Sequence, residues 1–339
     1  MHLPRTSSRR ITRRAGLVAA GSAAALVLAA CGSGDGSLGD SSSSDGASSA
    51  SGETSTVSVG VIPIIDVAPI YLGVDQGFFA DHGLELDLEL AQGGAAIVPG
   101  VVSDQYQFGF SNTTSLLLAT DKGLPVKVVA SGNQGTDDPE EDFAGILVRS
   151  DSGISSPKDL AGKKVAVNTL NNINTTTTNA LVRADGGDPS GIDYVELAFP
   201  DIPAAVEKGD VDAGQVVEPF VTTGAADGLE NIGSNYAGVA PDLQVAMYFT
   251  STTYAQSHPD TVEAFAAAMD ESLTYAQEHP DEARAILLQY TKIDEAATQK
   301  VVLPQWDEQI TEDTVQQLAD LGMQDGLFEK DVDISTLLP

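Results

Sequence analysis

The chain is predicted to fold as an α/β protein in which parallel strands are covered by helices. From Val57 onward, short apolar runs alternate with longer amphipathic segments. This β-α-β-α order implies a parallel sheet with helices packed on its faces. The chain has 339 residues, of which 42% are hydrophobic and 19% charged. It is therefore long enough for two such lobes, each with a packed core.

The first part of this body contains four expected strands and two expected helices. Leu84–Leu90 alternates leucine with acidic residues, which is typical of a half-buried strand. Pro69 suits the first turn of a helix, and Gly123 permits the left-handed turn that ends one. The expected strands are Val57–Ile62, Leu84–Leu90, Tyr106–Phe110 and Val126–Ala130, and the expected helices start at Pro69 and span Asn112–Lys122.

A second unit with the same alternation begins near residue 150. Its expected strands are Lys163–Asn168, Asp193–Leu197 and Val211–Val217, and its expected helices are Asn174–Ala184, Ile202–Lys208 and one that starts at Pro219. The chain after about Thr250 is expected to be mostly helical. His258-Pro259-Asp260 and His279-Pro280-Asp281 resemble metal or catalytic motifs, but proline followed by an acid is a helix-start pattern. We therefore interpret both as structural.

The first thirty residues have the order of an export signal. A basic region that ends at Arg14 is followed by an apolar run from Ala15 to Ala30, which is shorter than the roughly 20 residues of a membrane span. Leu28-Ala29-Ala30-Cys31 then resembles a lipobox, in which the cysteine sulfur carries diacylglycerol. Residues 1–30 are expected to be a signal peptide. Cys31, the only cysteine, is expected to carry a lipid that holds the protein on the extracytoplasmic face of the cell membrane.

Residues 31–56 are expected to be a tether between this lipid and the globular body. Glycine and serine dominate the segment, and Leu38 is its only large apolar residue. Such a composition cannot bury a core, so the segment is expected to be disordered.

The charge of the chain excludes one class of partner. It carries 17 basic and 49 acidic residues, a formal net charge of −32, and the first thirty residues contain five of the basic ones. So acidic a surface repels nucleic acid and anionic lipid headgroups, and it favours a soluble monomer. Membrane association is therefore expected through the lipid alone.

The motif inventory argues against an enzyme. Gly109-Phe110-Ser111-Asn112-Thr113 lacks the second glycine of a hydrolase nucleophile elbow. We find no P-loop, no dinucleotide-binding glycine motif and no zinc-ligand spacing. No catalytic residue, cofactor or metal ion is therefore expected. A secreted hydrolase and a surface adhesin without a small ligand remain as less favoured alternatives.

Four stretches in order resemble the nitrate/sulfonate/taurine and thiamine-pyrimidine-precursor branch of ABC-importer binding proteins. They are Ala68–Gly73 with Gln76–Leu84, Lys122–Val129, Pro157–Val165, and Lys208–Ala213 with Glu218–Phe220. They resemble, in turn, the family's "AP-x-Y…GFF…GL", "G-x-P-V-K-V-V", "DLKGKKV" and "G-x-VDA…EP(Y/F)" patterns. The resemblance spans most of residues 57–290.

The resemblance implies a type II periplasmic-binding-protein fold, in which two α/β lobes are joined by two crossing strands around a ligand cleft. The crossings are expected at Ala144–Arg149 and Gln244–Thr250. One lobe would then be residues 57–148 plus 246–339, and the other residues 149–245. The implied function is the extracytoplasmic solute-binding component of an ABC importer. Its partners would be the permease and ATPase subunits.

The ligand is expected beyond the carboxyl ends of the strands, where helix N-termini present unpaired N–H groups. Ser111–Thr114 and Glu218 also fit a purely structural role at a helix start, so both roles stay open for them. The expected ligand-binding residues are Ile65, Asp66, Ala68, Gly93, Gly94, Ser111, Asn112, Thr113, Asn133, Asn168, Thr169 and Glu218.

The resemblance leaves two kinds of ligand open. Pyrimidine-binding members carry tryptophan and Pro-Asn in the first loop, whereas this chain has Ile64–Pro69 there and its only tryptophan is the distant Trp306. This favours a small polar molecule of the sulfonate, taurine or nitrate type over a thiamine-precursor pyrimidine. No lysine or arginine falls at the expected positions, so an anion would rely on helix N-termini. If Glu218 accepts a hydrogen bond from the ligand, a bare inorganic anion is disfavoured.

Overall fold

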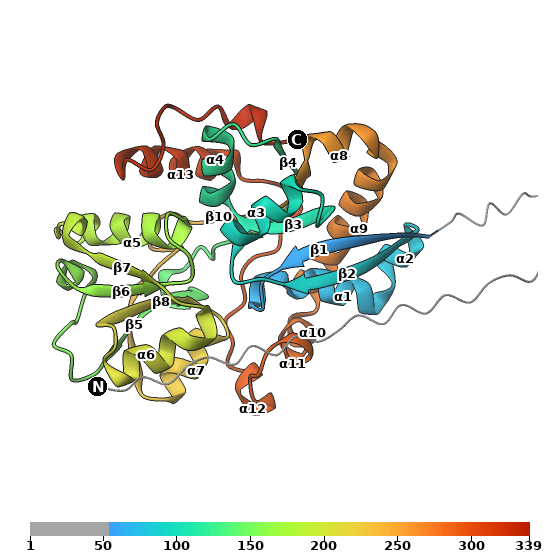
Figure 1. The fold of residues 1–339 in the computed structure, drawn as a ribbon. Coiled ribbons are helices and arrows are strands. Elements are labelled where there is room, and N and C mark those ends of the chain that lie inside the picture. Colours follow the sequence, from blue (N-terminus) through green and yellow to red (C-terminus); the bar gives the residue numbers. More distant parts are fainter. Residues whose placement is uncertain (1–53) are drawn as a thin grey trace, which may run out of the picture. The chain divides into compact units, whose positions relative to one another are not determined.

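The computed structural model describes residues 54–339 (Figure 1). Two five-stranded sheets organise this part of the chain, each the centre of one lobe. The first sheet has the order β2-β1-β3-β10-β4 and the second β7-β6-β8-β5-β9. Signal peptide, Cys31 and most of the tether lie outside the described residues. Among the described helices, none has the length and apolar character that a membrane crossing requires.

The strands have the following bounds. The first sheet contains β1 (Ser55–Val61), β2 (Leu84–Leu90), β3 (Phe108–Asn112), β4 (Val126–Gln134) and β10 (Gln244–Ser251). The second contains β5 (Ala144–Arg149), β6 (Lys164–Val167), β7 (Asp193–Glu196), β8 (Ala213–Val217) and β9 (Leu229–Ser234).

The helices of the first lobe and of the C-terminal region are α1 (Ala68–Gln76), α2 (Phe78–Asp81), α3 (Gly94–Val102), α4 (Thr113–Asp121), α8 (Thr252–Ser257), α9 (Pro259–Glu278), α10 (Pro280–Ala285), α11 (Leu287–Tyr290), α12 (Glu295–Thr298) and α13 (Glu312–Gln324). Those of the second lobe are α5 (Ile173–Ala184), α6 (Ile202–Lys208) and α7 (Phe220–Ala226).

Both sheets are mixed rather than purely parallel. β1 pairs in parallel with β2 and β3, and β6 pairs in parallel with β7 and β8. β10 and β5 run antiparallel to both of their neighbours. Each of these two strands is the first after the chain passes from one lobe to the other. The β-α-β part of the prediction is confirmed, and the antiparallel member of each sheet comes from the lobe crossing.

The chain passes between the lobes at residues 135–143 and 235–243, since β4 and β9 end just before these segments and β5 and β10 follow them. The two segments are hydrogen-bonded to each other, because the Gly135 N–H donates to the Leu243 carbonyl at 2.8 Å. Ala144–Arg149 and Gln244–Thr250, expected as the crossings, are seen as β5 and β10 themselves.

The core of the first lobe is aromatic. Phe108 of β3 stacks on Phe265 of α9 with a ring-centroid distance of 3.9 Å, and Phe79 of α2 packs against the same Phe265 ring. In Figure 1, α9 lies beside α1, and it also contacts α2 and the strands β2 and β4. α9 and α10 begin at Pro259 and Pro280, so the helix-start interpretation of the two His-Pro-Asp sequences is confirmed.

Helix α3 and strand β9, like the short helix α2, were not expected from the sequence. Helix α3 starts at a glycine and contains Pro99, both of which weaken a helix signal. In strand β9 only the first residue, Leu229, is buried and the rest are exposed or half-buried, so no apolar alternation marks the strand. Most other bounds agree within about two residues, although β4 runs on to Gln134.

Candidate functional site

A small buried cavity lies between the two lobes. Its volume is about 20 Å³, room for about one water molecule. Its lining combines one carboxylate, three amides and one phenol with apolar groups. The lining residues are Ile62, Ile64, Asp66, Phe110, Asn112, Asn168, Ile173, Asn174, Phe199, Val217, Tyr236, Val245 and Ala246. Most of them follow or end parallel strands of both sheets, which is where α/β sheets bind ligands, and Val245 and Ala246 lie at the start of the antiparallel strand β10.

The first lobe contributes Asp66 and Asn112. Asp66 lies in a 3₁₀ turn shortly after β1, and Asn112 is the last residue of β3 and the N-cap of α4. The Asn112 Oδ1 accepts a hydrogen bond from the Ser115 N–H at 2.9 Å and another from the Ile173 N–H at 3.3 Å. Both roles foreseen for Asn112 are therefore compatible, because it caps a helix and also lines the cavity.

The second lobe contributes a set of linked amides. Asn168 directly follows β6, and its Oδ1 accepts hydrogen bonds from Asn172 Nδ2 at 2.8 Å and Asn174 Nδ2 at 2.7 Å. Asn174 Oδ1 in turn accepts from the Tyr236 hydroxyl at 2.7 Å. These bonds fix the orientation of the amides at the N-terminus of α5, so the cavity has a rigid polar wall.

Asp66 is the one carboxylate in the lining. Its Oδ1 accepts a hydrogen bond from Asn133 Nδ2 at 3.2 Å, and Trp306 Nε1 donates to its backbone carbonyl at 3.3 Å. Burial raises the pKa of the Asp66 carboxyl to about 7, against the lowering effect of its hydrogen bonds. Trp306, distant in sequence, thus packs against the first loop without lining the cavity.

Glu218 lies behind the cavity wall. Its carboxylate accepts hydrogen bonds from the Thr222 N–H, the Thr222 hydroxyl and the Val302 N–H, at 3.0, 2.7 and 3.3 Å. Burial raises its pKa to about 7. The neighbouring Val217, not Glu218, lines the cavity. These contacts give the side chain a structural role at the start of α7, which is the alternative to ligand binding that the sequence left open.

The remaining expected site residues surround the cavity without lining it. Ile65 donates its N–H to the Glu218 carbonyl across the lobes at 3.0 Å, and Thr113 donates its hydroxyl to the Gln244 carbonyl at 2.6 Å. Asn133 holds Asp66, as described above. Ala68, Gly93, Gly94, Ser111 and Thr169 are close-packing neighbours of the lining residues.

Sequence reasoning missed Asn174 and Tyr236 as lining residues. Asn174 lies at the start of an expected helix, and the run of amides Asn168–Asn174 was the available signal. Tyr236 comes from the second crossing segment, where no pattern marks it. Its position depends on a contact over 62 residues of sequence with Asn174.

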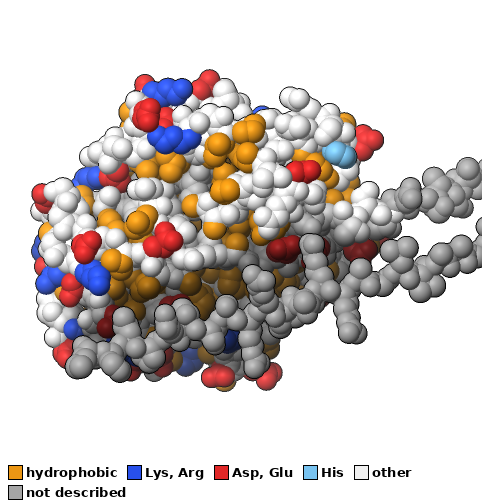
Figure 2. Space-filling view, in the orientation of Figure 1, with side chains coloured by type: hydrophobic (Ala, Val, Ile, Leu, Met, Phe, Trp, Pro, Cys, Tyr) orange, Lys and Arg blue, Asp and Glu red, His pale blue; other side chains and the backbone are white. Residues whose placement is uncertain are grey.

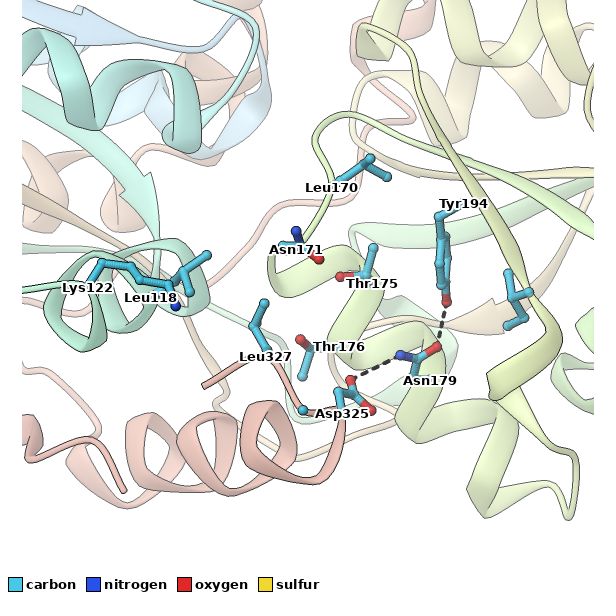
Figure 3. A pocket seen from close by; sticks show the side chains of 12 residues that line it. Leu118, Lys122, Leu170, Asn171, Thr175, Thr176, Asn179, Tyr194, Asp325 and Leu327 are labelled. Atoms are coloured by element: carbon cyan, nitrogen blue, oxygen red, sulfur yellow. Dashed lines mark hydrogen bonds between the residues drawn. The ribbon is translucent and has the colours of Figure 1, made fainter. Parts of the chain in front are cut away.

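A larger hollow of about 540 Å³ lies between α4 and α5 (Figure 3). There Asn179 donates to Asp325 and accepts from the Tyr194 hydroxyl, at 3.0 and 2.8 Å. Asp325 also pairs with Arg183. These polar groups largely satisfy one another. The hollow is rimmed mainly by α4, α5 and the chain after α13, with Leu170 and Asn171 of the loop after β6 and Tyr194 of β7, and it receives no residue from the strand ends of the first sheet. We therefore assign the candidate site to the small cavity.

Charged side chains are more numerous on the outer surface than in the site. Figure 2 shows acidic side chains scattered over one face of the body, with a few basic ones among them. The cavity lining holds a single acid and no lysine or arginine. The cavity lining therefore differs in charge from the surface around it.

Two α/β lobes that close over a polar cavity at their strand ends define a periplasmic-binding-protein fold. The chain belongs to the NMT1/THI5 like family, whose pattern matches residues 64–283.

Two relatives illustrate this membership. The chain is 29% identical over 195 residues to the taurine-binding periplasmic protein of Escherichia coli (strain K12), a match that spans 57% of this chain and 58% of that protein. It is 23% identical over 282 residues to a Bacillus subtilis (strain 168) protein provisionally named as aliphatic sulfonates-binding, covering 80% and 82% of the two chains. This chain therefore covers less than two thirds of the length of the taurine-binding relative.

The fold has solved counterparts. The alkanesulfonate-binding protein SsuA from Xanthomonas axonopodis pv. citri, bound to MOPS, superposes with a TM-score of 0.71 at 17% identity. The superposition covers 84% of this chain and 98% of that one. This likeness concerns the fold.

Proposed function

We propose that the protein is the extracytoplasmic solute-binding component of an ABC importer and that it delivers a small polar organic molecule to a permease. One observation carries this proposal: a polar cavity is buried between two lobes that are linked by two adjacent chain crossings. Two lobes joined in this way can rotate apart to admit a solute and close over it. The named relatives, which bind taurine and sulfonates, support the same class of ligand.

The cavity favours a small ligand. At about 20 Å³ it admits little in its closed form, so a solute of taurine size requires the lobes to open slightly. The amides of Asn112, Asn168 and Asn174 can donate hydrogen bonds to sulfonate oxygens. The N-terminus of α5 lies beside them and favours negative charge.

The lining also supports a binding role without catalysis. It includes no serine, cysteine, histidine or lysine, so it offers no nucleophile with an adjacent base. We therefore propose that the protein is not an enzyme.

A second candidate ligand is a small heterocycle such as a thiamine-precursor pyrimidine. Phe110 and Phe199 line the cavity and could stack on a planar ring. The small volume opposes this candidate, because a ring needs more space than a short aliphatic chain.

We further propose the arrangement along the chain. Residues 1–30 would be removed on export, Cys31 would carry the lipid, and residues 31–56 would hold the body at a distance from the membrane. The lobes expected from the sequence, residues 57–148 plus 246–339 and residues 149–245, place β5 in the first lobe, whereas β5 pairs with β8 and β9 in the second sheet. We therefore propose that the lobe boundaries and the hinges lie in the crossing segments 135–143 and 235–243. The protein would act as a monomer.

Calorimetry with the purified protein tests the function. The panel is taurine, isethionate, ethanesulfonate, nitrate and an aminopyrimidine. We expect one molecule of at least one sulfonate to bind per chain with a Kd in the micromolar range or tighter, roughly −8 kcal/mol or more. Binding of no panel member would contradict the proposed ligand class. Tightest binding by the pyrimidine would establish the second candidate.

A further inference from the structure

The Asp66 side chain has an unused hydrogen-bonding atom at the cavity. The residue is only 2% exposed, and its Oδ1 is held by Asn133. Its Oδ2 is buried and has no hydrogen-bond partner among residues 54–339. A buried acceptor without a partner is costly, so it marks a position where a donor would be favourable.

The surroundings of Asp66 provide no countercharge. The titratable groups near it are the hydroxyls of Tyr236, Tyr248 and Tyr290, whose pKa values are raised well above the ordinary value, mainly by burial. These phenols are neutral at physiological pH. None of the cavity-lining residues is lysine or arginine. The ionised carboxylate therefore lacks the positive partner that a buried charge requires.

We propose that the solute carries a protonated amine, and that Asp66 Oδ2 accepts a hydrogen bond from this ammonium group. The inference rests on the proposed function and names the substrate class of the same site: a short amino sulfonate. Its ammonium end would meet Asp66, and its sulfonate end would meet the amides at the N-terminus of α5. A sulfonate or nitrate without an amine would place a second negative charge near the ionised Asp66, which is repulsive.

Two ligands of nearly equal size test the inference. Taurine and isethionate share the sulfonate and the two-carbon chain, and they differ by an ammonium group in place of a hydroxyl. With the purified full chain, we expect taurine to bind at least about tenfold tighter than isethionate, as charge-assisted hydrogen bonds are the stronger kind. Equal affinities, or tighter isethionate binding, would overturn the inference.

A variant without the charge of Asp66 tests whether this residue causes the preference for taurine over isethionate. Asp66→Asn keeps the shape and one acceptor oxygen, and it is expected to weaken taurine binding at least about tenfold while isethionate binding stays equal or improves. Asp75→Asn removes an exposed carboxylate from α1 and should bind both ligands as the wild type does. An unchanged ratio of taurine to isethionate affinity in Asp66→Asn would contradict the role of Asp66.

The dependence of taurine affinity on pH provides a further test, which can be made on the wild-type protein. Burial raises the Asp66 pKa to about 7, so the carboxylate gains its charge as pH rises through that value. Taurine affinity should increase from about pH 5.5 to about pH 8, and the increase should vanish in Asp66→Asn. A decrease would show that a protonated Asp66 donates to an anion. If isethionate binds and taurine does not, the amine is wrong while the solute-binding function stands; if no panel ligand binds, the proposed ligand class falls as well.

Discussion

Asn112 and Ile173 link the two lobes through a single hydrogen bond, because the amide oxygen that caps α4 also accepts the Ile173 N–H at the start of α5. The same oxygen thus contributes to the stability of one lobe and to closure onto the other. Asn112→Ala should lower the free energy of unfolding by about 1 kcal/mol through loss of the cap. It should also weaken solute binding, because the closed form loses a cross-lobe bond.

Asn112→Asp separates these effects, since aspartate caps a helix as well as asparagine does. We expect a melting temperature near that of the wild type and weaker binding of a sulfonate, because the added charge faces the cavity. Thermal unfolding and calorimetry of both variants measure the two quantities. Unchanged affinity in Asn112→Ala alongside reduced stability would assign Asn112 a capping role alone.

Gly93 approaches the second lobe too closely for a side chain. A Cβ at this position would lie 2.8 Å from Asn168 Nδ2 and 2.9 Å from Thr169 Cγ2. Its backbone is extended, with φ of −179°, so alanine causes no local strain. Gly93→Ala should therefore oppose closure, weakening solute binding about tenfold with little change in stability.

Gly233→Ala is the matched control for Gly93, because Gly233 lies within strand β9 rather than in a crossing segment and its nearest contact would be an ordinary 3.4 Å. Small-angle scattering with saturating ligand should show a larger radius of gyration for Gly93→Ala than for Gly233→Ala. Identical affinity and radius in the two variants would show that the lobes do not close at Gly93.

The raised Asp66 pKa also predicts how the stability of the ligand-free protein depends on pH. The folded-state pKa of about 7 exceeds the ordinary value of 3.8, so ionisation opposes folding. The penalty is absent below about pH 4, grows as pH rises, and is complete above about pH 7. Asp66→Asn removes it and should gain stability relative to the wild type, on the order of a few kcal/mol at pH 8 and much less near pH 4.5.

Urea unfolding of the wild type, Asp66→Asn and Asp75→Asn at several pH values measures this dependence. Asp75→Asn is the control, because it removes an exposed carboxylate that lies outside the cavity lining. If the stability difference between Asp66→Asn and the wild type does not change with pH, burial does not raise the pKa of the Asp66 carboxyl.

Cys31 provides a test of the proposed anchor. Cys31→Ser should yield a protein that is released into the medium or retained as an unprocessed precursor, because serine cannot carry the thioether-linked lipid. Cell fractionation followed by mass measurement distinguishes these species. A mature-length Cys31→Ser protein that still fractionates with membranes would refute the lipid anchor.

The sequence predicted much of the fold because its signals are local. Apolar runs, Pro69 and Gly123 mark strands, a helix start and a helix end from neighbouring residues alone. The rule that ligands bind beyond strand ends also identified Asp66, Asn112 and Asn168, three residues that line the cavity.

The sequence was less informative about the direction in which a side chain points. Glu218 satisfies the same strand-end rule, but the Val302 N–H and Thr222 hold its carboxylate away from the cavity. Tyr236 reaches the cavity through a chain crossing. Such placements depend on contacts between distant segments, which no local pattern records.

The most direct test of the account is a crystal structure of the chain grown with the panel ligand that binds most tightly. The account predicts density for one ligand between the lobes, in contact with Asp66, Asn112, Asn168 and Asn174. Density in the hollow between α4 and α5, or anywhere else with the cavity between the strand ends unchanged, would contradict it.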